Sequence, residues 1–144
     1  MIKKLLAIMT CVVALASCTS QKKAETEQEA QDNKVLVLYY SQTGATAAVA
    51  EEIKEQLGAD IERIDLEVPY DGDFQQTIER CQKEMESKEC PALKPLKSNL
   101  DDYDVIFLGY PIWFGTYAPP VEALIQNEKF AGKTVVPFCT FGSG

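Results

Sequence analysis

The run KVLVLYY at residues 34–40 passes directly into SQTGAT at residues 41–46, an order typical of a strand that leads through a polar loop into a helix. The first run is almost continuously aliphatic or aromatic, which is the pattern of a strand buried on both faces of a parallel sheet. Beyond the loop, Val49, Ile53 and Leu57 recur every four residues, and glycine follows as a helix stop. We therefore predict a central strand, a polar loop and an amphipathic helix.

The alternation of strand and helix continues along the chain. Further strands are predicted at 60–66, 104–110 and 134–139. Charges interrupt the first of these, which favours a position at the sheet edge. Helices are predicted at 74–87, from apolar residues at helical spacing, and from Pro119 onwards, because proline is tolerated in a first turn. Such alternation produces right-handed crossovers, so the predicted fold class is α/β with a doubly wound parallel sheet.

The composition excludes several classes of function. The 144 residues fit one globular domain, with 46% hydrophobic and 25% charged side chains. Fourteen basic and 22 acidic residues give a formal charge of −8, so we expect no nucleic-acid partner. The chain contains no histidine, which removes a required member from Ser-His-Asp triads, Cys-His pairs and the usual zinc sites. Catalysis would therefore depend on other groups or on a cofactor.

Residues 1–18 have the features of a signal peptide. Lys3 and Lys4 precede an uncharged stretch at 5–16, which suits a secretory h-region and is too short for a membrane span. The ending LASC at 15–18 resembles a bacterial lipobox, in which Cys18 would be acylated after cleavage. An ordinary signal peptide with a nearby cysteine is the alternative. The lipobox interpretation predicts an exported lipoprotein anchored in the cell envelope, on the periplasmic or outer-surface side.

Residues 19–33, TSQKKAETEQEAQDN, contain no aromatic or large aliphatic side chain and cannot bury enough apolar surface to fold. We predict a flexible linker there, with an r.m.s. reach of about 20 Å. The folded domain would then cover residues 34–144. Removal of both N-terminal lysines takes the formal charge from −8 to −10, so the exported part is distinctly acidic.

Three segments follow predicted strands, at 41–46, 111–115 and 140–144. Parallel strands end at one sheet edge, where open α/β sheets bind their ligands. The first segment offers hydroxyls, a glycine and the free amides of a helix N-terminus, which together suit a phosphate group. It contains no lysine or arginine and fits neither a Walker A loop nor a G-x-G-x-x-G fingerprint. An ordinary strand-to-helix turn uses the same residue types and is the alternative.

The second segment contains an aromatic pair. Trp113 and Phe114 are predicted to lie in a loop, beside Gly115. They could cover the end of the sheet, or they could stack on a planar heterocycle. A phosphate cradle and an aromatic platform without a cationic clamp favour flavin mononucleotide (FMN) over a nicotinamide cofactor.

The segments YYSQTGAT, GYPIWFGT and VVPFCTFGSG resemble those of flavodoxins, and the resemblance runs from residue 34 to residue 144. It implies a flavodoxin-like fold, FMN as the cofactor and electron transfer as the function. It also implies that the first segment holds the phosphate while the other two lie against opposite sides of the isoalloxazine. The predicted FMN-binding residues are Ser41, Gln42, Thr43, Gly44, Ala45, Thr46, Pro111, Ile112, Trp113, Phe114, Gly115, Thr140, Phe141 and Gly142.

The sequence departs from the flavodoxin pattern in three respects. Ala45 stands where such loops commonly carry a polar residue, and Phe141 stands where related sequences often carry histidine. The family pattern also continues through another helix, a fifth strand and a last helix. We therefore expect the chain to be a fragment, with a degenerate or partner-completed protein as the alternative. The strand at 134–139 would then form a bare, aggregation-prone edge.

The sequence as a whole predicts a membrane-tethered, FMN-binding electron-transfer protein. The alternatives are an NAD(P)H-dependent quinone or flavin reductase and a binding module that has lost its cofactor. Acidic charge favours a redox partner protein with a basic docking face. Cys81 and Cys90 could form a disulfide in an oxidising compartment, although free thiols are the preferred interpretation.

Overall fold

The computed structural model describes residues 33–142. The predicted signal peptide at 1–18, with Cys18, and all but the last residue of the predicted linker at 19–33 lie outside these residues, as do residues 143–144. The strands are β1 (Val35–Tyr39), β2 (Asp60–Arg63), β3 (Val105–Trp113), β4 (Thr116–Tyr117) and β5 (Thr134–Thr140). The helices are α1 (Ala45–Leu57), α2 (Phe74–Ser87) and α3 (Pro119–Asn127), and a short 3-10 helix, η1, spans Leu100–Asp102.

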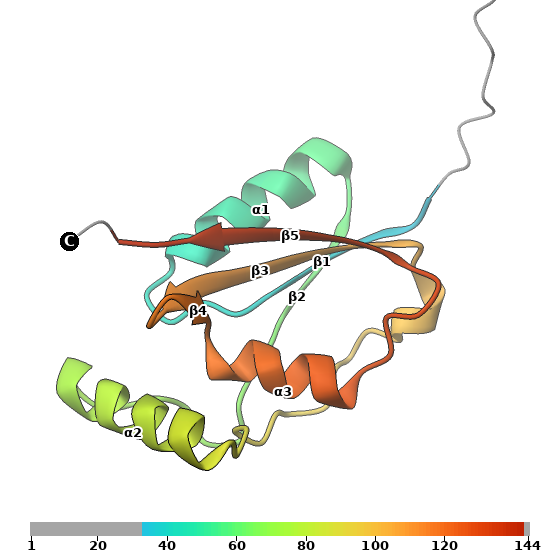
Figure 1. Cartoon of the computed structure of the whole chain (residues 1–144). Coiled ribbons are helices and arrows are strands. Elements are labelled where there is room, and N and C mark those ends of the chain that lie inside the picture. The colour runs from blue at the N-terminus through green and yellow to red at the C-terminus, as the bar shows by residue number, and fades with distance from the viewer. Residues whose placement is uncertain (1–32, 143–144) are drawn as a thin grey trace, which may run out of the picture. The chain divides into compact units, whose positions relative to one another are not determined.

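Four parallel strands form the main sheet in the order β2-β1-β3-β5 (Figure 1). β1 lies between β2 and β3 and is buried on both faces, as its apolar run predicts. Among the strands of residues 33–142, β2 pairs only with β1 and forms one edge, which confirms the predicted edge position. Within the described residues β5 pairs with β3 alone and forms the other edge. The predicted α/β class with a doubly wound parallel sheet is confirmed.

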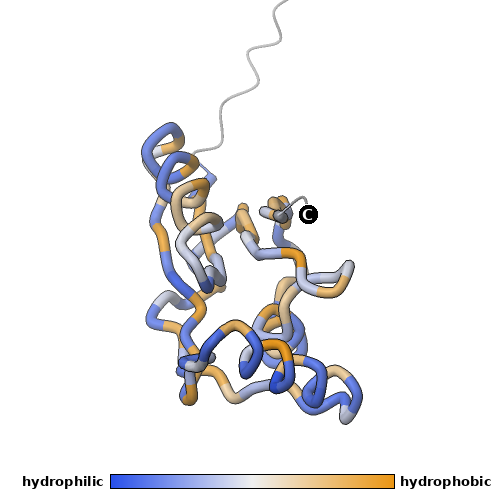
Figure 2. The backbone as a smooth tube through the Cα atoms, turned by 90° about the vertical axis from the view of Figure 1, so that its left-hand side faces the viewer, coloured by the Kyte–Doolittle hydropathy of each residue, from blue (hydrophilic) through white to orange (hydrophobic). Residues whose placement is uncertain are grey.

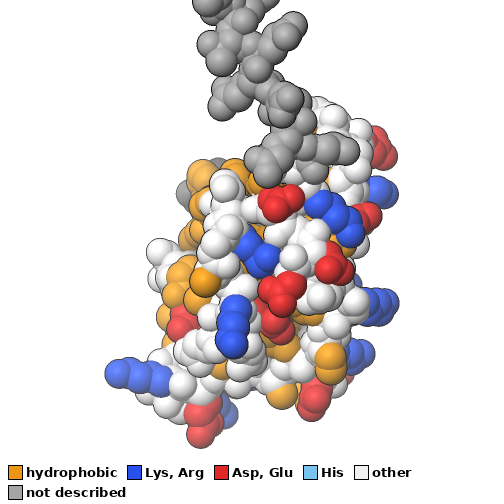
Figure 3. Space-filling model, turned by 90° about the vertical axis from the view of Figure 1, so that its right-hand side faces the viewer, with side chains coloured by type: hydrophobic (Ala, Val, Ile, Leu, Met, Phe, Trp, Pro, Cys, Tyr) orange, Lys and Arg blue, Asp and Glu red, His pale blue; other side chains and the backbone are white. Residues whose placement is uncertain are grey.

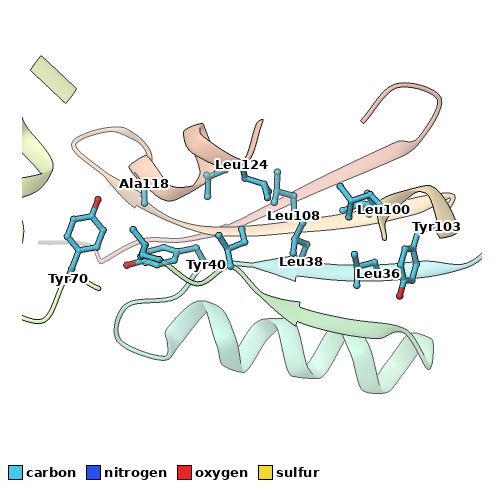
Figure 4. Close-up of a cluster of buried hydrophobic side chains, with 13 residues drawn as sticks. Leu36, Leu38, Tyr40, Tyr70, Leu100, Tyr103, Leu108, Ala118 and Leu124 are labelled. Carbon is cyan, nitrogen blue, oxygen red and sulfur yellow. The ribbon is translucent and has the colours of Figure 1, made fainter. Parts of the chain in front are cut away.

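The core has two parts, one on each face of the sheet. Side chains of β1 alternate between them, because successive residues of a strand point to opposite faces. On one face, Leu36 and Leu38 pack with residues of β3 and with Leu124 of α3 (Figure 4). On the other face, Val37 and Tyr39 pack beneath Ala50 of α1. This burial on both faces keeps the sheet rigid, so the carboxyl ends of its parallel strands lie side by side at one end of the sheet.

β3 runs past its predicted end. It continues to Trp113 because Pro111 stays in register with Thr140 of β5 and Trp113 pairs with Thr116 of β4. Phe114 and Gly115 then form a two-residue turn with φ values of 50° and 80°, which are typical of a type I′ hairpin. The predicted loop position of Trp113 is therefore wrong: Trp113 ends a strand, and only Phe114 and Gly115 form the turn. β4, which was not predicted, closes the hairpin.

Helix α2 has its predicted bounds but an unexpected position. Asp73 and Gln76 cap its start reciprocally, with Asp73 Oδ1 accepting from the Gln76 N–H at 2.9 Å. Its close packing partner is α3 rather than the sheet, and Figure 1 shows it standing below α3, away from the strands. Apolar residues are interspersed with polar ones along α2 (Figure 2), and Phe74, Ile78, Cys81 and Met85 recur at helical spacing. The helix is therefore amphipathic, although it does not cover the sheet. None of the helices within residues 33–142 is long and apolar enough to span a membrane.

Candidate functional site

A pocket of about 810 Å³ opens at the edge of the sheet where the parallel strands end, the edge that faces the viewer in Figure 2. Its volume lies within the ordinary range of small-molecule sites. The pocket brings together all three segments that were predicted to meet there. The predicted site residues that line it are Gln42, Thr43, Ala45, Thr46, Pro111, Ile112, Trp113, Phe114, Thr140, Phe141 and Gly142.

Three predicted residues, Ser41, Gly44 and Gly115, do not line the pocket and shape its loops instead. Ser41 is buried, and its Oγ accepts a hydrogen bond from the Gly44 N–H at 3.1 Å. Gly44 has φ 95° and Gly115 has φ 80°, a left-handed region that glycine enters at little cost. The Ser41 oxygen therefore helps to fix the conformation of this loop.

The amino end of α1 is open toward the pocket. Gly44 is the N-cap residue, and no side chain within the described residues caps the helix there. The first N–H groups of α1 consequently have no intrahelical acceptor, and the helix dipole favours negative charge at this position. Thr43 and Ala45, both exposed, line the pocket beside these groups. The arrangement suits an anion, as the loop sequence predicts.

A cation stands behind this loop that sequence reasoning missed. Arg63, at the end of β2, donates from Nη2 to the Ser41 carbonyl oxygen at 2.9 Å. The loop itself has no lysine or arginine, so the positive charge comes from a neighbouring strand. Only the pairing of β2 with β1 places it there, which no local sequence signal shows.

The first and third segments are joined by a hydrogen bond. The Oγ1 atoms of Thr46 and Thr140 lie 2.8 Å apart, at the wall of the pocket. Thr46 is 1% exposed, so its hydroxyl is committed to this contact and is less available to a ligand than the exposed Thr43 hydroxyl. The bond fixes β5 relative to the amino end of α1.

The aromatic residues have two different environments. Trp113 packs edge-on against Tyr40 and Tyr70, with ring centroids 5.9 and 5.4 Å apart, and also lines the pocket. It therefore covers the end of the sheet and presents part of its ring to the pocket. Phe114 and Phe141 are 52% and 74% exposed and lie at the pocket wall. Such rings supply apolar area and orientation to a planar ligand.

Helix α2 supplies a pocket wall that was not predicted. Five residues from α2 and its approach line the pocket, namely Gly72, Phe74, Thr77, Ile78 and Cys81. Their helical spacing is visible in the sequence, but that pattern alone favours contact with a core. Cys81 is 1% exposed, and burial, with the nearby Glu84 carboxylate, raises the pKa of its thiol to about 11. Cys81, Cys90 and Cys139 are free thiols.

Residues 34–144 match the sequence model of a protein family described as Flavodoxin. The chain belongs to the flavodoxin family. This confirms the resemblance that its loop sequences show. A search of curated proteins finds no match to this flavodoxin.

Solved structures similar to this flavodoxin share its fold. A "putative flavoprotein" from Bacteroides eggerthii DSM 20697 is 39% identical, with a TM-score of 0.71 over 78% of this chain and 73% of that chain. A second, from Bacteroides uniformis ATCC 8492, is 36% identical, with a TM-score of 0.70 over 78% and 74%. A flavoprotein from Lactobacillus acidophilus NCFM, solved in complex with FMN, is 27% identical, with a TM-score of 0.71 over 78% and 77%.

Proposed function

We propose that this flavodoxin binds FMN in the 810 Å³ pocket and serves as an electron-transfer protein. One observation carries the proposal: the uncapped amino end of α1 and the aromatic side chains Trp113, Phe114 and Phe141 belong to a single pocket. An FMN complex of the Lactobacillus acidophilus protein supports the same cofactor here. Bound FMN would supply reversible uptake of one or two electrons.

The residues present fit the phosphate of FMN. A carbon atom built at the Cβ position of Gly44 meets no atom within 4 Å, so the space beside the loop is open to a ligand. The Thr43 hydroxyl and the first amides of α1 would donate to the phosphate oxygens, and Arg63 would add positive charge from behind the loop. Ala45 has no polar group to offer, and the backbone N–H at this position does not depend on its side chain.

The aromatic residues fit the ring of the cofactor. Phe114 and Phe141 would contact it from the exposed part of the pocket, and Trp113 from the part that adjoins the core. None of the described residues that line the pocket is charged, so these residues would exclude water from the ring without placing a charge against it. The second and third segments would thereby hold opposite sides of one planar group.

The proposal includes a tether to the cell envelope and a basic redox partner. The LASC sequence at 15–18 supports acylation of Cys18, and the following linker supports a domain held clear of lipid headgroups. Acidic and basic side chains lie interspersed on the face at the amino ends of the strands (Figure 3). Attraction of a basic partner would therefore follow from the acidic net charge of the whole domain rather than from a patch on that face.

The pocket also favours a second candidate function. The apolar residues of α2, including Phe74 and Ile78, form a wall that none of the predicted FMN-binding segments contributes. An NAD(P)H-dependent quinone or flavin reductase needs a site for a second planar molecule beside the flavin, and this apolar wall would suit such a molecule. Electron transfer to a protein partner remains the first candidate because, among residues 33–142, the pocket lining includes no lysine or arginine to bind the phosphates of a nicotinamide cofactor.

Titration with FMN and riboflavin tests the proposed cofactor. FMN should bind with a stoichiometry of one and quench the fluorescence of Trp113, the only tryptophan of the chain, and it should bind more tightly than riboflavin. Absence of FMN binding would leave a module without a cofactor and refute the proposal. Rapid NAD(P)H consumption by the FMN complex in the presence of a quinone would identify the reductase instead.

A further inference from the structure

Tyr70 contacts three walls of the pocket without lining it. It lies between β2 and α2 and is 4% exposed. Its ring packs edge-on against Trp113, with centroids 5.4 Å apart and planes at 77°. Its carbonyl oxygen accepts a hydrogen bond from Nε2 of Gln42, in the phosphate loop, at 2.7 Å. Its hydroxyl donates to the carboxylate of Glu84 on α2.

A second set of contacts joins Tyr70 to helix α2. The Arg80 guanidinium lies 4.2 Å from the centroid of the Tyr70 ring, and its Nε pairs with Glu84 at 2.9 Å. Nη1 of Arg80 also donates to the carbonyl oxygens of Val68 and Pro69, at 3.0 and 2.8 Å. Because α2 packs on α3 and not on the sheet, these contacts determine how far its apolar wall stands from the strands.

The loop at 41–46, which would hold the phosphate, is also bonded to Tyr40. Oε1 of Gln42 accepts a hydrogen bond from the Tyr40 hydroxyl at 2.6 Å, and the Tyr40 ring lies edge-on to Trp113, at 5.9 Å between centroids. Tyr40, Gln42, Tyr70 and Trp113 thus form a closed circuit of contacts. Displacement of Tyr70 would disturb both the phosphate loop and the tryptophan.

We propose that Tyr70 is a positioning residue of the cofactor site, which orients Trp113 and holds the α2 wall at a fixed distance from the phosphate loop. The effect on FMN rests on the proposed function, whereas the orientation of Trp113 belongs to the cofactor-free protein as well. Burial, together with the hydrogen bond to Glu84, raises the pKa of the Tyr70 hydroxyl far above its ordinary value. The hydroxyl therefore stays a donor to Glu84 throughout the physiological pH range.

Fluorescence of Trp113 tests the positioning role directly, because the chain has one tryptophan. Tyr70→Leu removes the ring, and Tyr70→Phe keeps the ring but removes the hydroxyl bond to α2. Tyr103→Phe is the matched control: Tyr103 is 8% exposed, and its hydroxyl donates to the Asp60 carboxylate at 2.8 Å, at the opposite end of the sheet. All three variants lose a contact of a buried tyrosine, so a merely structural effect would be shared.

Without cofactor, the wild type and the variants should differ in how strongly acrylamide quenches the fluorescence of Trp113. Quenching should rise in Tyr70→Phe and rise further, by about twofold or more, in Tyr70→Leu, since the edge-on contact that shields the indole is lost. With FMN added, Tyr70→Phe should raise the Kd by about 2- to 10-fold, as expected for loss of one hydrogen bond. Tyr103→Phe should lower the Tm to a similar extent and change neither quantity.

Each outcome bears on the proposal. If both Tyr70 variants lower the Tm but leave Trp113 quenching at the level of Tyr103→Phe, Tyr70 is an ordinary core residue and the proposal is overturned. If Tyr70→Leu does not fold, the shift in Tyr70→Phe decides the question. If the wild-type protein fails to bind FMN, the proposed function fails, while quenching of Trp113 without cofactor still decides whether Tyr70 positions it.

Discussion

The Oγ1 atoms of Thr46 and Thr140 lie 2.8 Å apart, a contact that joins the first turn of α1 to the end of β5 across 94 residues of sequence. The two segments are far apart in the sequence, and no single turn connects them. This hydrogen bond therefore fixes the distance between the loop at 41–46 and the end of β5, which both line the pocket. Because Thr46 is almost fully buried, water does not replace its partner easily.

Replacement of Thr46 by valine should destabilise the fold by about 1 kcal/mol, the usual net contribution of one hydrogen bond, because valine keeps the shape and removes the hydroxyl. In a double-mutant cycle with Thr140→Val, the two losses should be less than additive. The measurement is urea unfolding of the two single variants and the double variant. Thr134→Val, at the exposed start of β5, serves as the control. Strictly additive effects would show that the two hydroxyls do not interact.

The exposed hydroxyl of Thr43 should matter for FMN and not for riboflavin. Thr43→Ala removes a donor to the phosphate that only FMN carries, and a hydrogen bond to a charged group contributes about 1.5–3 kcal/mol. We expect the Kd for FMN to rise by roughly tenfold or more, with the Kd for riboflavin unchanged. Fluorescence titration with both ligands measures this, and Thr134→Ala is the matched control. An equal loss of affinity for both ligands would rule out the phosphate role.

Phe114 should exchange stability for ligand binding. Its φ of 50° is a left-handed conformation that a phenylalanine adopts at a cost, whereas Asn-Gly is a favoured type I′ turn. Phe114→Asn should therefore stabilise the cofactor-free protein by up to about 1 kcal/mol and weaken FMN binding by removing an aromatic contact. Thermal unfolding and FMN titration measure the two effects. A variant that is less stable and binds FMN normally would contradict the prediction.

Cys81 should be the slowest of the three described thiols to react with iodoacetamide at pH 8. With its pKa raised to about 11 by burial, only about one molecule in a thousand carries the thiolate, the reactive form. Its rate should increase about tenfold per pH unit toward pH 11, and bound FMN should lower it because Cys81 lines the pocket. Peptide mass spectrometry measures each site. Cys81 reacting as fast as the exposed Cys139 would contradict the burial argument.

The same shift in pKa has a consequence for stability. Burial favours the neutral thiol of Cys81 over the thiolate. The free energy of unfolding that depends on this thiol is therefore at its full value below pH 9.0, the ordinary pKa, and decreases as the pH rises toward about 11. The alkaline destabilisation of the wild-type protein should therefore exceed that of Cys81→Ala over this range.

Cys18 should place the protein in the membrane fraction. Each buried methylene of an acyl chain contributes about 0.8 kcal/mol, so two or more chains make the anchoring effectively stable. Detergent phase separation of the full-length protein expressed in a bacterium should recover the wild type in the detergent phase and Cys18→Ala in the aqueous phase. Aqueous recovery of both would favour an ordinary signal peptide over a lipobox.

Local patterns in the sequence predicted most of the secondary structure because those patterns have local causes. Gly58 was predicted to stop the first helix, and it ends α1 in a left-handed conformation. Pro119 was predicted to open a helix, and α3 begins there. The end of β3 was missed because pairing with β4 and β5 extends it, and a pairing partner is not visible in the strand itself. Gly109 also interrupts the apolar run of β3. The structure explains it: a Cβ there would lie 2.2 Å from Cζ of Phe138 on the neighbouring strand.

The candidate site was predictable as far as it follows from strand ends. Topology alone brings the carboxyl ends of β1, β3 and β5, with the residues that follow them, to one side of the sheet, so eleven of fourteen predicted residues line the pocket. The contributions of α2, Arg63 and Tyr70 could not be predicted, because each depends on contacts between segments distant in sequence. The local hydrogen bond from the Gly44 N–H to Ser41 Oγ was not predicted either, and the role of Ser41 in FMN binding stays a prediction.

Helix α2 leaves the carboxyl edge of the sheet uncovered, and this has a consequence for the lifetime of the protein in the cell. A helix packed directly on the sheet would bury apolar surface where this protein has a cavity of about 810 Å³. Without a ligand, local unfolding near α2 should therefore cost less free energy. A ligand at 100 times its Kd adds about 2.7 kcal/mol to the free energy of unfolding. Proteases would therefore degrade the empty form first, and the steady-state amount of protein would follow the supply of flavin.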